Sequence, residues 1–293
     1  MSAGSLLVGA PQPMHIWKTP SGIGLAADTW GSPDRPLVIL LHGGGQTRHA
    51  WGETGVRLGN AGYFAVAYDA RGHGDSTWSP DGDYGLEVLA QDLRCVIDAA
   101  NGAQPVLVGA SLGGATSLVA IGEQRVEAAA LILVDFVPYT EPAGVDRIRK
   151  FMRQKPEGFD SLEAVAEAIS EYRRTRSRRR DLDGLAKNVR IGNDGRYHWH
   201  WDPRFIAQPV DLRGRHERLC ACARRLSAPT LLVRGASSDV VSDKGVREFL
   251  ELCPHADYIN VAEAGHMVAG DRNDRFGRVA IDFLQRKVPL PDL

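Results

Sequence analysis

The pattern of apolar and polar residues divides the chain into an alternating first part, a different middle part and an alternating last part. Near-continuous apolar runs of strand length cover residues 36–43, 63–70, 105–111 and 129–135. Strands of this kind are buried on both faces, as in a parallel sheet. Helix-length segments lie between them, at 49–60, 84–100 and 112–122. Repetition of strand and helix predicts an α/β fold, an open and mostly parallel sheet with right-handed crossovers, preceded by an antiparallel pair at 14–20 and 24–30.

The alternation stops after Val134 and resumes near residue 230. Between these points we expect an amphipathic helix over 161–174, a short hairpin turning at Asn193-Asp194-Gly195 and a helix over 211–226. Strands at 230–235 and 256–263, with helices at 243–252 and 272–286, then complete the sheet. The sequence therefore predicts a core domain of residues 1–137 and 229–293, with a mainly helical cap inserted at 138–228.

Composition and charge narrow the class of protein. Hydrophobic residues make up 43% and charged residues 24% of the 293 residues, and the formal net charge is -1. This balance is typical of a globular enzyme and provides no field for nucleic acid or an acidic membrane surface. No signal peptide or membrane span is recognised, so we expect a cytoplasmic protein. The pattern does not define the oligomeric state, and a homodimer is one of the states it allows.

Metal and disulfide chemistry are not expected. The four cysteines are irregularly spaced, and Cys220 and Cys222 are interpreted as small residues on a helix rather than metal ligands. His198 and His200, one residue apart on a strand, would share a face and could meet a zinc ion, but no third ligand is evident. We therefore expect no metal and no cofactor.

The strongest chemical signal is the stretch Gly109-Ala110-Ser111-Leu112-Gly113. It matches G-x-S-x-G directly after a predicted strand and before a predicted helix, which is the context of a nucleophile elbow. The tight turn holds the serine in strained backbone geometry and projects its hydroxyl outward, and glycines leave room for the neighbouring segments. Ser111 is therefore the candidate nucleophile.

A serine nucleophile needs a base to take its proton and an acid to orient that base. In this architecture the expected order along the chain is serine, acid, histidine. Asp239 follows the strand at 230–235, and His266 follows the last strand. Asp135, directly after the strand at 129–135, is a rival acid, with Asp239 preferred because its loop matches the usual acid loop more closely.

Five short motifs in this order resemble those of the α/β-hydrolase superfamily. They are LLHGGG at 40–45, DARGHGDS at 69–76, GASLGG at 109–114, RGASSD at 234–239 and AGH at 264–266. The resemblance extends over about residues 14 to 287 and implies that the insertion is a helical cap that roofs the pocket. Several motifs also resemble those of cofactor-free haloperoxidases.

Further residues are expected around the nucleophile. The backbone N–H groups of Leu112 and Gly44 form the expected oxyanion hole, with Gly45 as an alternative donor. His42 is expected to support the oxyanion loop beside the substrate, and Asp69 to hold backbone amides. We expect the aromatic side chains of Trp51, Phe136, Trp199 and Trp201 to line the substrate pocket, although those on the cap can equally bind cap to core.

The predicted reaction is hydrolysis of a small to medium carboxylic ester through an acyl-enzyme. Ser111 argues against epoxide hydrolases and dehalogenases, which resemble this chain in fold but attack with an aspartate. A lactonase, a carbon–carbon hydrolase or a perhydrolase with the same triad remains an alternative, and a non-catalytic small-molecule receptor is a further one. The arginine-rich run at 173–180 is interpreted as a solvated helix end, with attraction of an anionic substrate as the alternative.

Overall fold

The computed structural model describes residues 4–7, 9–173, 185–208, 211–262, 265 and 273–290. Within these residues the main sheet has eight strands in the order β1-β2-β4-β3-β5-β6-β9-β10. The first two pairings, β1 with β2 and β2 with β4, are antiparallel, and the remaining neighbours are parallel. The strands are β1 (His15–Lys18), β2 (Gly24–Trp30), β3 (Leu37–Leu41), β4 (Phe64–Tyr68), β5 (Val106–Ala110), β6 (Ala130–Val134), β9 (Thr230–Gly235) and β10 (Asp257–Val261).

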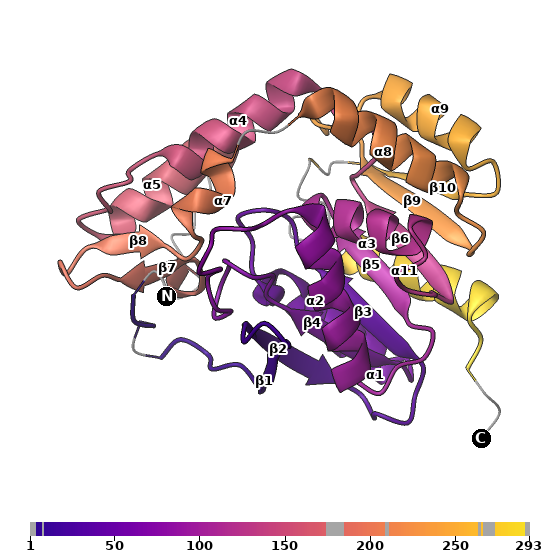
Figure 1. Cartoon of the computed structure of the whole chain (residues 1–293), viewed down its shortest axis with the longest axis horizontal. Helices are drawn as coiled ribbons and strands as arrows, with labels where there is room; N and C mark the ends of the chain where they lie inside the picture. The colour runs from indigo at the N-terminus through magenta and orange to yellow at the C-terminus, as the bar shows by residue number, and fades with distance from the viewer. Residues whose placement is uncertain are drawn as a thin grey trace.

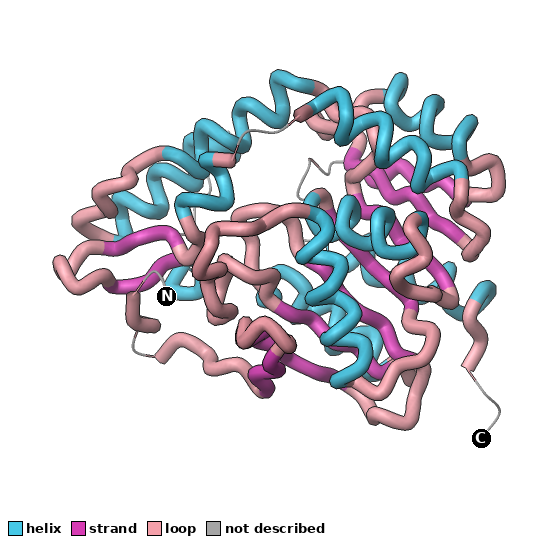
Figure 2. Tube along the Cα trace, viewed as in Figure 1, coloured by secondary structure: helices cyan, strands magenta, loops and turns pink. Residues whose placement is uncertain are grey.

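Helices cover both faces of this sheet (Figure 1). On one face the strands pack against α2, α3, α8 and α9, and on the other against α1 and α11. The helices of the core are α1 (Gly52–Asn60, preceded by the 3-10 turn η1, Arg48–Trp51), α2 (Leu86–Ala99), α3 (Leu112–Gly122), α8 (Leu212–Arg224), α9 (Asp243–Leu252) and α11 (Asn273–Lys287). Figure 2 shows the same layering, with the strands enclosed between helices.

Each central strand contributes to both layers because successive side chains point to opposite faces. In β3, Ile39 and Leu41 belong to the cluster beneath α2 and α3, whereas Val38 and Leu40 belong to the cluster beneath α1 and α11. All residues of β3, β4, β6 and β9 are buried. The prediction of a mostly parallel sheet with two buried faces is confirmed.

A second group of elements lies to one side of the sheet, at the left of Figure 1, and we refer to it as the cap elements. It comprises α4 (Pro142–Arg153), α5 (Leu162–Arg173), the 3-10 turn η2 (Ala186–Asn188), the hairpin strands β7 (Val189–Ile191) and β8 (Tyr197–Trp199), and α7 (Pro203–Ala207). Their buried residues form a separate apolar cluster that includes Met152, Val165 and Trp199. The hairpin predicted at Asn193-Asp194-Gly195 is present, with Gly195 at φ 76°.

Helix α8 lies within the residues predicted to form the inserted cap, but it packs on the sheet of the core. The range 138–228 includes α8, but Leu219, Cys222 and Ala223 of this helix belong to the main core cluster. Gly122 of α3 shows how close the approach is, because a Cβ at that position would lie 2.4 Å from the Cβ of Cys222. Helix α8 is therefore part of the layer that covers the sheet, although its first turns also reach the cavity described below.

Candidate active site

Ser111 lies at the turn between β5 and α3 in the geometry that the motif predicts. Its backbone has φ 47° and ψ -105°, a combination that costs energy for a residue with a side chain. A Cβ at Gly109 would lie 2.4 Å from the carbonyl oxygen of Gly113, and a Cβ at Gly113 would lie 2.3 Å from that of Leu41. Both glycines are thus required sterically, and the strained serine presents its side chain to the cavity that it lines.

The expected oxyanion hole is formed by two segments that contact each other. The amide of Gly113 donates to the carbonyl of His42 over 3.1 Å, which ties α3 to the loop after β3. In the described part of the chain, the amides of Gly44 and Leu112 have no hydrogen-bond acceptor. The amide of Gly43, in contrast, donates to Oε1 of Gln46. The two predicted donors are therefore available to a substrate oxygen, whereas their neighbour is already occupied.

His42 supports this loop with both ring nitrogens. Its Nδ1 is 2.8 Å from the carbonyl oxygen of Gly43, and its Nε2 accepts from the amide of Ala70 over 2.9 Å. These contacts require the proton on Nδ1, and burial lowers the pKa of this imidazole, which keeps it neutral. His42 is not among the described residues that line the cavity. His42 thus contacts the loop of Gly43 and Gly44 from its buried side, and it does not lie at the cavity surface where a substrate contact was expected.

Asp135 and Asp239, the two candidate acids, have different surroundings. Asp135 follows β6 with φ 46°, is 1% exposed and lines the cavity with Ser111. Its Oδ1 accepts from the amide of Gly235 over 3.0 Å, and its Oδ2 accepts from the hydroxyl of Ser238 over 2.5 Å. The loop after β9 thus directs two hydrogen bonds towards Asp135.

Asp239 instead pairs with a cap residue. Its Oδ2 lies 2.6 Å from a guanidinium nitrogen of Arg147 on α4, and each of the two side chains is 35% exposed. Asp239 is not among the described residues that line the cavity. The structure therefore brings Asp135 to the site of Ser111 and connects Asp239 to the cap.

His266 lies outside the described residues, as do residues 174–180 of the arginine-rich run. The strand that precedes His266 in the sequence can be placed, because β10 runs parallel to β9 with Val261 opposite Gly235. Strands β5, β6 and β9 end at the same edge, where Ala110 is the partner of Val134 and Val134 that of Val233. The segments carrying Ser111 and the two candidate acids begin at this edge.

The cavity at this edge has a volume of about 1090 Å³ and lies between core and cap. Of the residues predicted to surround the substrate, Gly44, Gly45, Leu112, Phe136, Trp199 and Trp201 line it. Phe151, Met152 and Tyr172 also line it, and the sequence did not identify them as pocket residues. Their helical spacing is the same in a purely structural amphipathic helix, so no pattern distinguishes them.

The prediction for Trp51 is wrong. Its side chain is 1% exposed, and its ring centroid lies 5.7 Å from that of Phe276 on α11. The turn η1 directs this indole to the opposite face of the sheet from α3. Trp51 consequently stabilises the packing of α1 and α11 instead of touching a substrate.

The two histidines of the hairpin do not converge on a common ligand. His198 lies 3.0 Å from Oδ2 of Asp194 within the hairpin. His200 is fully buried, accepts from the amide of Gly74 on Nδ1 and has its Nε2 3.3 Å from the carbonyl of Gly45. No cluster of metal-binding side chains occurs in the part of the chain that the structure describes. His200 instead joins the cap to the oxyanion loop.

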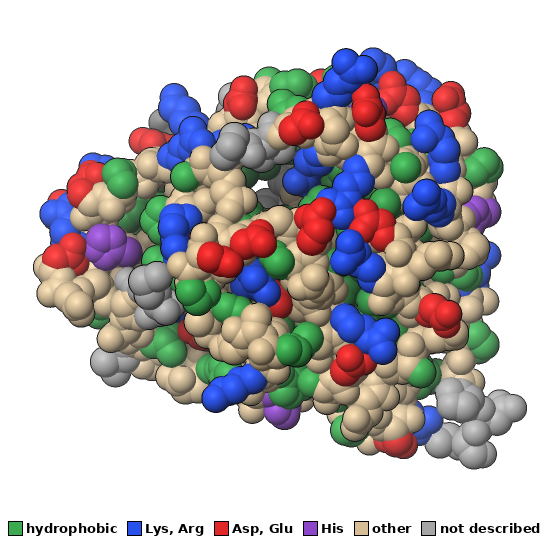
Figure 3. All heavy atoms as spheres, in the orientation of Figure 1, with side chains coloured by type: hydrophobic (Ala, Val, Ile, Leu, Met, Phe, Trp, Pro, Cys, Tyr) green, Lys and Arg blue, Asp and Glu red, His purple; other side chains and the backbone are tan. Residues whose placement is uncertain are grey.

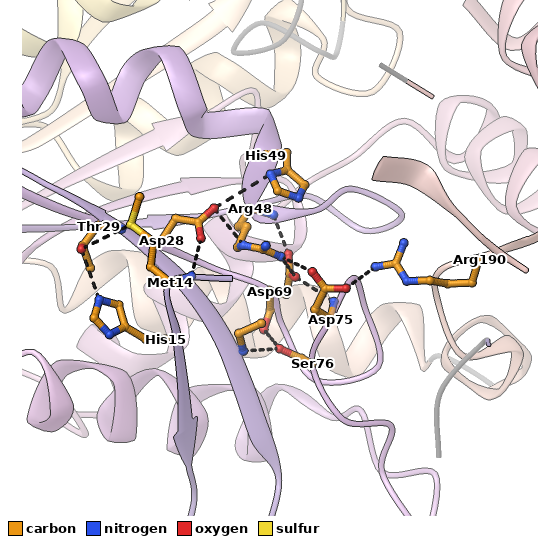
Figure 4. A network of polar contacts seen from close by, with 11 residues as sticks. Met14, His15, Asp28, Thr29, Arg48, His49, Asp69, Asp75, Ser76 and Arg190 are labelled. Carbon is orange, nitrogen blue, oxygen red and sulfur yellow. Dashed lines mark hydrogen bonds and ion pairs between the residues drawn. The ribbon is translucent and has the colours of Figure 1, made fainter. Parts of the chain in front are cut away.

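A buried charge network holds the loop after β3, which carries the expected oxyanion donor Gly44 (Figure 4). The guanidinium of Arg48, which is fully buried, bonds Asp28 over 2.9 Å, Asp69 over 2.6 Å and Asp75 over 2.8 Å. As expected, Asp69 also holds backbone amides, those of Arg48 and Asp75. Arg190 of β7 reaches the other oxygen of Asp75 over 2.6 Å. The network therefore connects the loop after β3, the loop after β4 and the cap hairpin, and no single motif predicted it.

Replacing Arg48 by methionine is expected to lower the free energy of unfolding by about 3–5 kcal/mol, because Asp69 would remain buried without its cation. Urea unfolding followed by circular dichroism measures the change. The matched control is Arg57→Met, which removes an exposed pair with Glu53 and should cost less than about 1 kcal/mol. Equal losses in the two variants would contradict the assigned role of the network.

A comparison with known proteins gives the family. The model of the α/β hydrolase fold matches residues 36–272. The chain belongs to the α/β-hydrolase family. An esterase of Mycobacterium tuberculosis, Rv0045c, is 33% identical over 258 residues, which cover 85% of this chain and 82% of that protein. A crystal structure of that esterase superposes with a TM-score of 0.71 at 29% identity, covering 95% of this chain and 93% of the other.

A second solved structure, that of E-2-(acetamidomethylene)succinate hydrolase, has a TM-score of 0.78 at 24% identity and covers 90% of this chain and 96% of the other. At this identity the similarity supports the fold. The α/β-hydrolase described here is thus an enzyme of that class, and its relatives support ester hydrolysis. No helix among its described residues has the length and apolar character needed to cross a bilayer.

Proposed function

We propose that this α/β-hydrolase cleaves carboxylic esters through an acyl-enzyme on Ser111. The observation that carries the proposal is the strained Ser111 at the cavity surface, beside the available amides of Leu112 and Gly44. Two backbone donors beside a displayed hydroxyl provide a site for the oxyanion of a tetrahedral intermediate, which is the largest electrostatic contribution in acyl transfer. The similarity to an esterase at 33% identity supports the same class of substrate.

The proposed reaction has two halves. Oγ of Ser111 attacks the ester carbonyl carbon while His266 takes its proton, and the negative oxygen is bound by the amides of Leu112 and Gly44. Collapse of this intermediate breaks the bond to the alcohol, which leaves with the proton from His266. Water, deprotonated by His266, then attacks the acyl-enzyme and releases the acid and free Ser111.

We propose Asp135 as the acid that orients His266, in preference to Asp239. A carboxylate that orients a catalytic imidazole is usually buried and held by hydrogen bonds, as Asp135 is by Gly235 and Ser238. Asp239 is half-exposed and already neutralised by Arg147. The loop 234–239 would then support catalysis through the Ser238 hydroxyl, with Asp239 acting as a link to the cap.

The size and the aromatic lining of the cavity favour an ester of medium size with an apolar portion as the substrate. The cavity volume of about 1090 Å³ is slightly above the usual range for small-molecule sites. The rings of Trp199 and Trp201 stack with centroids 4.8 Å apart, and Phe151 lies 5.3 Å from Trp199. Such an aromatic wall favours an acyl or alcohol group with a hydrocarbon chain or ring.

Incubation with a fluorophosphonate tests the proposal directly. We expect a covalent adduct on Ser111, located by mass spectrometry of the proteolysed protein, because the reagent mimics the tetrahedral intermediate. Heat-denatured protein is the control and should remain unlabelled, since an unactivated serine reacts no faster than a solvent hydroxyl. An adduct on another serine, or none, would contradict the assignment.

A further inference from the structure

Arg215 on α8 is a cation in the active-site cavity that has no counter-ion among the described residues. It lines the cavity together with Ser111, and its side chain is partly buried. Its backbone amide donates to the carbonyl of Asp211, but its guanidinium has no hydrogen-bond or ion-pair partner among the described residues. A partly buried guanidinium that faces a cavity and has no acceptor from the described protein residues is suited to bind an anionic group of a ligand.

Two other arginines on the same helix, Arg213 and Arg218, are paired, in contrast to Arg215. Arg213 pairs with Glu217 over 2.9 Å, and Arg218 bonds both Glu87 and Glu123. Burial lowers the pKa of Arg215, and the like charge of Arg218 lowers it further. The surroundings of Arg215 thus disfavour its charged form, and an anion bound beside it would favour that form.

The other described residues of the cavity wall do not form an ion pair with Arg215. Among the lining acids, Asp135 is held by Gly235 and Ser238, and Glu248 lies 3.7 Å from Lys244. Asp146, which also lines the cavity, is on the exposed side of α4. Another lining cation, Arg149 of α4, donates to the carbonyl oxygens of Ile206 and Gln208 and to no other described acceptor. Figure 3 shows a hollow between the cap elements and the α8 side, with Lys and Arg side chains at its rim.

We propose that the substrate is an ester bearing a carboxylate at the end of its apolar portion, and that Arg215 binds this carboxylate. The planar guanidinium matches a carboxylate with two parallel N–H···O bonds. This inference rests on the proposed function and adds the charge of the substrate to it. Half-esters of medium-chain dicarboxylic acids are the substrate class that combines this charge with the aromatic wall.

Matched substrates test the inference. The kcat/KM of mono-p-nitrophenyl suberate is compared with that of p-nitrophenyl octanoate, which has the same chain length without the carboxylate. We expect Arg215→Met to lower the ratio of the two values by about 10- to 100-fold, the usual contribution of hydrogen bonds to a charged group. Arg215→Lys, which keeps the charge but not the fork, should restore part of the ratio.

The control is Arg224→Met, an exposed arginine on the same helix that is not among the described lining residues. It should leave the ratio unchanged. A ratio that is the same in Arg215→Met and the wild type would overturn the inference, because a purely structural loss lowers both values equally.

A binding measurement separates this inference from the proposed function. The Ser111→Ala variant, in which no acyl-enzyme can form, is titrated with monomethyl suberate and with methyl octanoate, and the fluorescence of the cavity tryptophans is recorded. Saturable binding of the anion that Arg215→Met weakens by at least about 10-fold would support the anion site even if no ester were hydrolysed. Equal binding of the two compounds would exclude it even if Ser111 proved to be the nucleophile.

Discussion

Ser111→Ala is expected to reduce kcat/KM for p-nitrophenyl butyrate by about 10⁵- to 10⁶-fold, because the covalent route disappears and only oxyanion and binding contributions remain. Initial rates at saturating and limiting ester concentrations give the value. Circular dichroism and urea unfolding accompany the kinetics, since removal of the hydroxyl relieves no strain at φ 47° and should leave the fold intact.

Ser237→Ala is a suitable control for that variant. Ser237 is exposed in the loop after β9 and belongs neither to the described cavity lining nor to the hydrogen bonds around Asp135. Its rate should stay within about twofold of the wild type, as for most exposed positions. If Ser111→Ala still hydrolysed the ester and was still labelled by the fluorophosphonate, the nucleophile would be another residue.

Asp135→Asn is expected to reduce kcat/KM by about 10⁴-fold, while Asp239→Asn should stay within about tenfold of the wild type. The amide keeps the shape of Asp135 but removes the charge that stabilises an imidazolium, and it can favour the wrong tautomer of the base. Asp239→Asn removes a half-exposed pair with Arg147, a contact of a kind worth about 0–1 kcal/mol.

The pair of variants decides between the two acids. Measurement of kcat/KM against pH for both identifies the one in which the base no longer functions normally. A loss confined to Asp239→Asn would restore the preference that the sequence motif suggests. Similar losses in both variants would indicate that the loop 234–239 and Asp135 act as one unit.

The fold could be predicted from the sequence because its signals are local. Strands β3 and β6 are apolar throughout, so burial on both faces follows from the residues alone. The nucleophile elbow could also be predicted, since Gly109 and Gly113 flank Ser111 at positions where a Cβ would collide with backbone atoms. In each case the local sequence and the global fold favour the same structure.

The choice of acid and the pocket lining depend on which way side chains turn, and no spacing rule contains that information. Asp239 has the right motif, yet a cap arginine far away in the sequence binds it. Trp51 follows a strand at the catalytic edge, yet its ring packs beneath the other face of the sheet. Arg48 gave no signal in the sequence, because its three carboxylate partners come from two other segments, β2 and the loop after β4.

Asp75 is held simultaneously by Arg48 from the core and Arg190 from the cap hairpin. Moving the hairpin away from the core would separate Arg190, which is 4% exposed, from its counter-ion Asp75. It would also break the contact of His200 with the carbonyl of Gly45. A rigid-body opening of the cap hairpin would therefore cost considerable free energy in this hydrolase, which disfavours it as a way for substrate to enter. We therefore expect turnover to be more sensitive to the size of the side chains that line the cavity than to the length of the hairpin turn.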